Sequence, residues 1–135
     1  ISPKEVIETV LETYRNQEDR IDISQVEGFI RQILGWREYM RGMYWMEMPE
    51  YKSLNALENT QSLPAFYWDA NTQMNCLQHS IQNSLDHAYA HHIQRLMITG
   101  NFALLTQTDP DAVDRWYLGI YADAVEWVQL PNTRA

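Results

Sequence analysis

The chain has 135 residues, of which 45% are hydrophobic and 21% charged, with 5 Gly, 5 Pro and one Cys. This length fits one domain of ordinary size, and the composition excludes the collagen-like, disulfide-rich and disordered classes. No apolar run approaches the roughly 20 residues needed to cross a bilayer. The lone cysteine and the lack of a signal-peptide pattern favour a reducing, cytoplasmic location.

The net charge is −8, from 10 basic and 18 acidic residues. Such a surface does not attract a polyanion on average, so nucleic-acid binding cannot be argued from composition alone. It would need a local basic face or a partner domain. The chain also opens at Ile1-Ser2-Pro3, without Met and directly on a helix signal. We therefore expect a single helical domain, residues 1–135, that is a fragment of a longer protein.

The first predicted helix spans residues 3–17. Ser2 fits its N-cap, Pro3 its first position, and Glu5 completes a capping box. Apolar residues then recur at helical spacing. They are Val6, Ile7, Val10, Leu11 and Tyr14.

A second capping box, Ser24 with Glu27, predicts a longer helix that extends to Pro49. Residues 49–72 sustain no period and are punctuated by Pro and Asn, which predicts a long ordered connection carrying Phe66-Tyr67-Trp68. Loops of this length inside compact domains tend to be functional.

A helical pattern returns over residues 73–107, where Gly100 predicts a break or close packing. Thr108 with Asp111 then predicts the cap of a last helix, with Pro110 just inside it. No stretch alternates like a strand, and no internal repeat occurs. The sequence therefore predicts an all-α fold.

One cysteine and all four histidines fall within seventeen positions: Cys76, His79, His87, His91 and His92. On one helix, Cys76 and His79 would share a face, as would His87 and His91. Sulfur and imidazole together suit zinc or iron. However, His79 and His87 would lie about 12 Å apart along the helix, too far for one mononuclear site. A buried cysteine with incidental histidines is the simpler interpretation.

The aromatic residues at helical spacing predict core packing. Trp116 and Tyr117 are adjacent, and neighbouring helical residues point about 100° apart. We therefore expect one of the two to face a second surface, a partner or a cofactor. Aromatic rings of this kind can stack on a flavin or a nucleobase, and they can also relay single electrons.

Two sets of charged residues attract attention. Arg37 and Arg41 are i,i+4 neighbours that could form a phosphate-binding patch, although Glu27 and Glu38 are near enough to neutralise it. Arg95 and Asp123 each lie in an apolar stretch. Because buried charges normally pair, we expect an Arg95–Asp123 ion pair.

Three longer strings carry a resemblance to a known family. Residues 27–39, EGFIRQILGWREY, look like the Q-x-x-G-W-R-E-F helix of the flavin-binding domain of photolyases and cryptochromes, with Tyr39 in place of Phe. Residues 87–102, HAYAHHIQRLMITGNF, and 116–132, WYLGIYADAVEWVQLPN, resemble the prokaryotic (6-4) photolyase group. This group comprises the iron–sulfur bacterial cryptochromes and photolyases, also described as deoxyribodipyrimidine photolyase-related proteins.

The resemblance covers nearly the whole chain. It implies the helical FAD-binding domain of a flavoprotein lyase that uses light-excited reduced flavin to transfer an electron to a (6-4) pyrimidine lesion in UV-damaged DNA. A cryptochrome-like blue-light sensor without repair activity is the first alternative, and a plain helical interaction domain is the second. Membrane association is not expected, and the oligomeric state stays open.

The resemblance also implies roles for individual residues. Those matching positions near the flavin are Gln32, Trp36, Arg37, Arg95, Asp123 and Gln129. Arg95 and Asp123 match an ion pair that borders the isoalloxazine ring. Gln129 falls at the position facing flavin N5, where this subgroup is expected to carry a carboxylate. An amide there can donate a hydrogen bond and retune flavin redox chemistry.

His92 matches the proton donor to the lesion, with His91 beside it; a histidine near neutral pKa can give and retrieve a proton. Trp68, Trp116 and Tyr117 match the electron-transfer chain that photoreduces the flavin. Cys76 matches the first of four cysteine ligands to a [4Fe–4S] cluster. The other three, and the domain that binds an antenna chromophore, are expected outside this chain, and the isolated chain is expected to bind FAD poorly.

Overall fold

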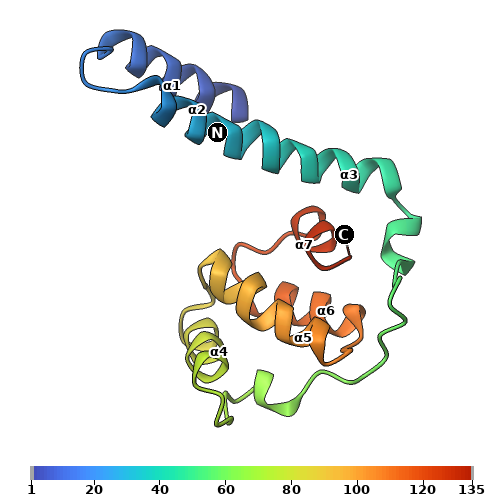
Figure 1. Ribbon diagram of the computed structural model, residues 1–135. Helices are drawn as coiled ribbons and strands as arrows, with labels where there is room; N and C mark the ends of the chain where they lie inside the picture. Colours follow the sequence, from blue (N-terminus) through green and yellow to red (C-terminus); the bar gives the residue numbers. More distant parts are fainter. Residues whose placement is uncertain (1, 135) are drawn as a thin grey trace. The chain divides into compact units, whose positions relative to one another are not determined.

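The computed structural model describes residues 2–134. The chain divides into two compact units, Ile1–Trp45 and Met46–Ala135. Over residues 2–134 every regular element is helical, and the only strand-like pairing is an isolated bridge between Gln61 and Thr108 (Figure 1). The predicted all-α fold is therefore confirmed.

The first unit opens with α1 (Pro3–Asn16), which begins as predicted. The Ser2 hydroxyl accepts a hydrogen bond from the Glu5 backbone N–H, and the Glu5 carboxylate accepts one from the Ser2 backbone N–H. This capping box satisfies two of the amide groups that a helix start leaves unpaired. One face of α1 packs against the next helix.

The second helix, α2 (Ile23–Arg31), begins earlier than predicted. Its N-cap is Asp22, which forms a reciprocal capping box with Gln25, so the predicted Ser24–Glu27 box is wrong. The two boxes overlap in sequence, and Asp and Ser cap equally well. With the earlier box, Ile23 and Ser24 lie inside the helix.

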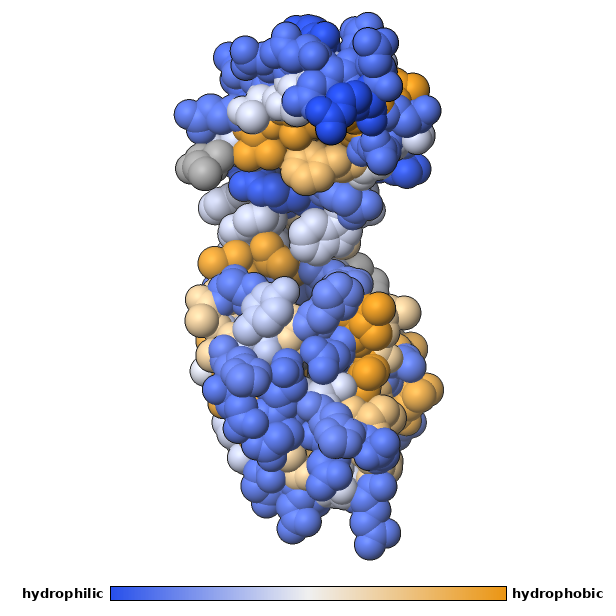
Figure 2. Space-filling view, turned by 90° about the vertical axis from the view of Figure 1, so that its left-hand side faces the viewer, coloured by the Kyte–Doolittle hydropathy of each residue, from blue (hydrophilic) through white to orange (hydrophobic). Residues whose placement is uncertain are grey.

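The chain then stays helical through η1 (Gln32–Glu38), a π-helical segment, into α3 (Tyr39–Glu47). The long helix expected up to Pro49 is thus present, with a change of helical type in its middle. Among the described residues of the first unit, Val26 alone is buried. Large apolar side chains accordingly remain on the surface as patches, which Figure 2 shows in orange.

The predicted connection is confirmed as an ordered segment of the second unit. It contains two short 3-10 turns, η2 (Glu50–Ser53) and η3 (Ala65–Tyr67). Gln61 anchors its middle: its N–H donates to the Gln107 carbonyl at 2.9 Å, and its own carbonyl accepts from the Asp109 N–H at 2.8 Å.

The helical region expected over residues 73–107 is interrupted after α4 (Asn75–His87), because Ala88 adopts a left-handed conformation, φ 50°. Two side chains and one backbone N–H from after α6 bind the carbonyls that follow α4. The Ala88 carbonyl accepts from the Ala122 N–H, that of Tyr89 from the Asn83 side chain, and that of Ala90 from Arg95 Nε. His87 and His91 therefore do not share a helix face, contrary to expectation.

Helix resumes as the π-helical η4 (Ile93–Gly100) and runs directly into α5 (Asn101–Leu105). The expected break at Gly100 is wrong, whereas the expected close packing is confirmed. A Cβ at Gly100 would lie 2.8 Å from the Tyr117 Oη.

The chain ends with α6 (Pro110–Ile120) and α7 (Glu126–Arg134), which pack against each other. The N-cap of α6 is Asp109, not Thr108, because the Asp109 carboxylate accepts from the Asp111 N–H at 3.0 Å. Pro110 occupies the first turn as predicted. The sequence did not predict α7, which contains Pro131 and has little amphipathic pattern.

The core of the second unit is an aromatic cluster centred on α6. Trp116, Tyr117 and Tyr67 are each at most 1% exposed, and Ile81 of α4 is fully buried. Tyr121 adds a fourth buried ring, and aliphatic residues complete the core: Ala70, Leu77, Ala90, Ala103 and Val113.

Candidate functional site

The predicted Arg95–Asp123 ion pair is confirmed. Arg95 Nη2 lies 2.7 Å from Asp123 Oδ1, and Arg95 Nε donates to the Ala90 carbonyl at 2.8 Å. The Arg95 side chain is 14% exposed, whereas that of Asp123 is 55% exposed. The pair thus joins a nearly buried cation to a half-exposed carboxylate at the surface of the second unit.

Two tyrosine rings enclose the guanidinium. Arg95 Cζ lies 4.0 Å from the centroid of the Tyr121 ring and 5.3 Å from that of Tyr89. Both distances fall within the range of cation–π attraction. The sequence pattern did not single out Tyr121, and its position two residues before Asp123 was the available signal.

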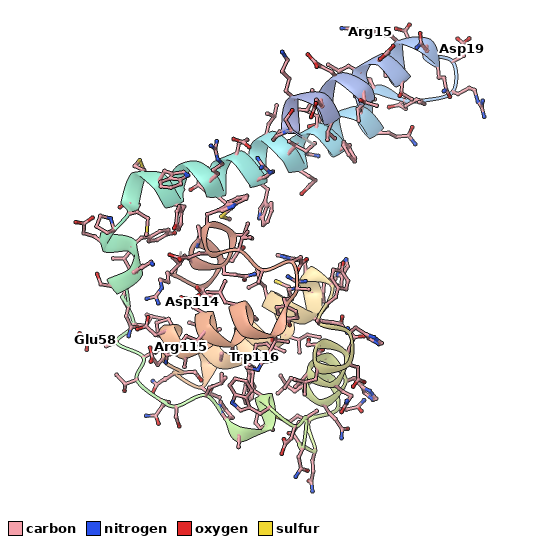
Figure 3. The ribbon with its side chains drawn as sticks, turned by 180° about the vertical axis from the view of Figure 1, so that it is seen from behind. Arg15, Asp19, Glu58, Asp114, Arg115 and Trp116 are labelled. Atoms are coloured by element: carbon pink, nitrogen blue, oxygen red, sulfur yellow. The ribbon has the colours of Figure 1, made fainter. Side chains whose placement is uncertain are left out.

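Trp116 and Tyr117 are both buried, so the expectation that one of them faces a second surface is wrong. Trp116 lies on α6 within the second unit (Figure 3) and is 0% exposed. The two residues contact different elements around α6. Trp116 Nε1 donates to the Tyr67 carbonyl of η3 at 3.0 Å, and Tyr117 Oη donates to the Arg95 carbonyl of η4 at 2.7 Å. A helix surrounded on both sides can bury neighbouring residues.

The rings of this cluster form a continuous set of contacts. Trp116 lies 5.1 Å from Tyr67, 5.6 Å from Tyr117 and 5.7 Å from Tyr121, measured between centroids. Trp68, in contrast, is 60% exposed and makes no ring contact with another described residue. The structure therefore brings two of the three predicted electron-transfer residues together and leaves the third at the surface.

Burial raises the pKa of three tyrosines in this cluster. Desolvation is the largest cause for Tyr67, Tyr117 and Tyr121. The effect is opposed at Tyr117 by the hydrogen bond with Thr99, and at Tyr121 by the one with Ser84. All three phenols are consequently neutral at physiological pH.

His91 and His92 lie on the exposed turn between α4 and η4. His91 Nδ1 accepts a hydrogen bond from the Ile93 N–H at 3.3 Å. The His91 N–H donates to Gln94 Oε1 at 3.2 Å. The turn therefore presents both imidazoles to solvent, with the His91 ring oriented by the start of η4.

In the first unit, Gln32, Trp36 and Arg37 all lie on η1, with Gln32 and Trp36 exposed and Arg37 half-buried. Glu38 pairs with both Arg37 and Arg41, so the expected neutralisation of that patch is confirmed, by Glu38. Glu27 pairs instead with Arg31, at 3.3 Å. Arg37, Glu38 and Arg41 line a cavity of about 710 Å³, together with Lys4, Ile7 and Leu34.

The π-helical segments η1 and η4 carry four of the predicted flavin contacts. Gln32, Trp36 and Arg37 lie on η1, and Arg95 lies on η4. The wider turn of a π-helix reorients side chains relative to an α-helix, and such segments occur frequently at functional sites. Each unit thus has at least one predicted flavin contact on its π-helical stretch, whereas Asp123 and Gln129 of the second unit lie outside η4.

Gln129 lies on α7 and is 5% exposed, within the packed part of the second unit. A buried amide offers two donors and an acceptor at a fixed position. It can therefore hydrogen-bond with a polar group held against α7.

Cys76 and His79 are exposed on α4, so the simpler interpretation of a buried cysteine is wrong. Among residues 2–134 no three His, Cys, Asp or Glu side chains are arranged to hold a metal ion. A [4Fe–4S] cluster needs four cysteine ligands, and this chain supplies one. The donor set therefore does not fit a cluster held by this chain alone.

Sequence reasoning also missed a buried ion pair between α6 and α7. The Arg134 side chain is 4% exposed. Its Nε donates to Asp114 Oδ2 at 3.0 Å, and its Nη1 donates to the Leu54 carbonyl at 2.8 Å. Arg134 also forms an ion pair with Asp111. Burial raises the pKa of Asp114, against the opposing effect of Thr133 and Arg134. The i,i+3 spacing of Asp111 and Asp114 was the available signal.

None of the described helices is long and apolar enough to cross a membrane. No protein-family model matches the chain. The sequence is 64% identical over 110 residues to a (6-4) photolyase of Agrobacterium fabrum. The match covers 82% of this chain and 22% of the relative, so the chain spans about a fifth of the length of that protein.

Proposed function

We propose that this chain, which is 64% identical over 110 residues to a (6-4) photolyase, is part of a light-driven enzyme that repairs (6-4) pyrimidine photoproducts in UV-damaged DNA. The observation that carries the proposal is the 64% identity to the Agrobacterium protein. Two features support it. The aromatic cluster contains Trp116 and Tyr117, and the ion pair consists of Arg95 and Asp123; the family resemblance assigns roles to all four residues.

The proposed cofactor is FAD, which supplies the electron for repair when reduced and excited by light. In the second unit, Arg95, Asp123 and Gln129 would contact it. These residues fit a flavin because Arg95 Nη1 makes no hydrogen bond within the described part of the chain, and Gln129 offers an amide. Gln32, Trp36 and Arg37, on η1 of the first unit, are proposed as flavin contacts from the family resemblance alone.

His92 is the proposed acid that gives a proton to the lesion, and His91 is its neighbour in this role. Their exposure supports the assignment, because a group that acts on DNA must be reachable from outside. An imidazole is suited to the task since its ordinary pKa lies near neutrality.

Trp116 and Tyr117 are proposed to carry electrons through the second unit, with Trp68 as the outer member. Contacts of 5–6 Å between ring centroids support the inner part of this path. The exposed Trp68 follows Tyr67 in the chain, and the Tyr67 ring contacts that of Trp116 at 5.1 Å between centroids, so Tyr67 lies between the two along this path.

The remaining assignments extend outside this chain. Cys76 is proposed as one ligand of a [4Fe–4S] cluster completed by other cysteines, and its exposure on α4 is compatible with that. The binding site of an antenna chromophore and most of the DNA-binding surface would also lie on other segments. A cytoplasmic location remains a prediction.

A chimera tests the proposal: the 110 matched residues of the Agrobacterium (6-4) photolyase are replaced by those of this chain. Flavin content is measured by absorption, and light-dependent repair with an oligonucleotide carrying one (6-4) lesion. We expect bound flavin and repair that requires light. A folded, flavin-containing chimera without repair would overturn the enzyme in favour of the sensor, and a folded, colourless chimera would favour the interaction domain.

A further inference from the structure

The orientation of the Arg95 side chain is determined from three sides. Nε is bonded to the Ala90 carbonyl, Nη2 to the Asp123 carboxylate, and the flat face rests 4.0 Å from the Tyr121 ring centroid. The two hydrogen bonds use adjacent parts of the guanidinium and leave Nη1 without a partner in the part of the chain that the structure describes.

The ion pair alone is a weak constraint. Asp123 is half-exposed, so its attraction for Arg95 is screened by water. The contact with Tyr121, which is 3% exposed, is shielded from water, and cation–π attraction strengthens on desolvation. The ring is therefore the more rigid of the two supports.

Tyr121 is itself fixed in position. Its Oη lies 3.0 Å from Ser84 Oγ, and the Ser84 hydroxyl donates its one hydrogen to the Ser80 carbonyl at 2.7 Å. Tyr121 is consequently the donor in the tyrosine–serine bond. Its ring also stacks on Tyr117, with 28° between the planes, and meets Trp116 edge-on.

From this geometry we propose that Tyr121 is a positioning residue: it holds the Arg95 guanidinium so that Nη1 is presented to a hydrogen-bond acceptor of the bound flavin. The inference rests on the proposed flavin site. Arg95 is thereby connected to the aromatic cluster in two ways. Tyr117 bonds its backbone carbonyl, and the Tyr121 ring that supports its side chain contacts Trp116.

Tyr89 provides a matched control. Its ring lies farther from the same guanidinium, at 5.3 Å, and is 55% exposed. Truncating Tyr89 thus removes an aromatic ring near Arg95 without removing its buried support. The Tyr121→Phe variant keeps the ring and loses only the hydroxyl, and serves as the conservative rescue.

The first measurement needs no flavin. In NMR spectra of the 135-residue chain, the Arg95 side-chain protons above the Tyr121 ring are expected at high field, and the Nε–H is expected to exchange slowly with water. Tyr121→Leu should abolish the high-field shift and speed exchange about tenfold, as loss of a desolvated cation–π contact allows. Tyr121→Phe and Tyr89→Leu should retain slow exchange. If Tyr121→Leu does not fold, the shift in the wild-type chain and in Tyr121→Phe still tests the contact.

The second measurement uses the chimera with the Agrobacterium photolyase. Tyr121→Leu should weaken FAD binding about tenfold, while Tyr121→Phe and Tyr89→Leu stay within about twofold of the parent. Equal FAD affinity with and without the ring, or ordinary Arg95 shifts in the wild-type chain, overturns the positioning role. A parent chimera that binds no FAD counts against the proposed function instead, and the NMR result then still decides whether Tyr121 orients Arg95.

Discussion

Tyr117 Oη lies 2.7 Å from the backbone carbonyl of Arg95 and donates a hydrogen bond to it, which ties α6 to η4. The same carbonyl accepts from Thr99 Oγ1 at 2.5 Å. Both bonds lie beside Gly100, whose missing side chain leaves the space that the Tyr117 hydroxyl occupies. A direct hydrogen bond therefore joins the aromatic cluster to the residue that forms the ion pair with Asp123.

Gly100→Ala should destabilise the second unit. The new methyl group would lie 2.8 Å from Tyr117 Oη, and overpacking of this kind costs about 1–3 kcal/mol. Urea denaturation measures the change. Gly119→Ala on α6 is the matched control, since a Cβ there meets nothing within 4 Å and a helical Ala should add about 0.5–1 kcal/mol of stability. If Tyr117→Phe does not reduce the cost of Gly100→Ala, the contact with the hydroxyl is not its cause.

Arg134→Ala should destabilise the same unit by about 3 kcal/mol, because it leaves the buried Asp114 carboxylate without its main cationic partner. Thermal or urea unfolding gives the measurement. Arg115→Ala, on the exposed residue beside Asp114 in Figure 3, should change stability by less than about 0.5 kcal/mol. Equal effects of the two substitutions would contradict a structural role for the buried pair.

The three buried tyrosines should make the fold sensitive to alkali. Their folded pKa values are raised above the ordinary 10.0, so the folded state retains protons that the unfolded state loses. The associated stability is fully present below pH 10 and is lost as the pH rises toward the raised values. The slope should approach about 1.4 kcal/mol per pH unit for each tyrosine.

Urea denaturation between pH 8 and 11 measures this slope. Tyr117→Phe removes one of the three groups and should reduce the slope by roughly a third. An unchanged slope in that variant would show that Tyr117 is not one of the groups responsible.

Trp116→Phe should slow photoreduction of the flavin in the chimera at least about tenfold. Phenylalanine retains most of the buried packing but is a far poorer electron donor than indole, and an electron-transfer rate depends exponentially on its barrier. Steady illumination with an external reductant, followed by absorption, provides the assay. Trp45→Phe, at a position 67% exposed in the first unit, should have no effect. Equal rates in both variants would exclude Trp116 from the path.

His92→Ala should lower the rate at which the chimera repairs the (6-4) lesion by about 10²-fold or more, while flavin content is retained. His87→Ala is the control, because His87 is also exposed but ends α4. Repair is followed by chromatography of the irradiated oligonucleotide. Repair by His92→Ala at the parent rate would refute the proton-donor assignment.

Sequence by itself determined the helical class, the capping box at Ser2, the ordered connection after Pro49 and the Arg95–Asp123 pair. These features depend on local patterns or on a general rule, namely that charges in apolar stretches find partners. The family resemblance likewise came from contiguous strings, which require no knowledge of the fold.

Tertiary structure alone decided where helices end and which rings meet. The break at Ala88 depends on Asn83, Ala122 and Arg95, which bind the carbonyls of residues 88–90 from separate elements. The burial of both Trp116 and Tyr117 depends on helices packed on two sides of α6. Tyr121 came under Arg95 because the turn after α6 is bonded to the turn after α4, through Ala122 and Ala88. The contacts of Ala122 with Ala88 and of Tyr121 with Arg95 join residues tens of positions apart, so no local period in the sequence records them.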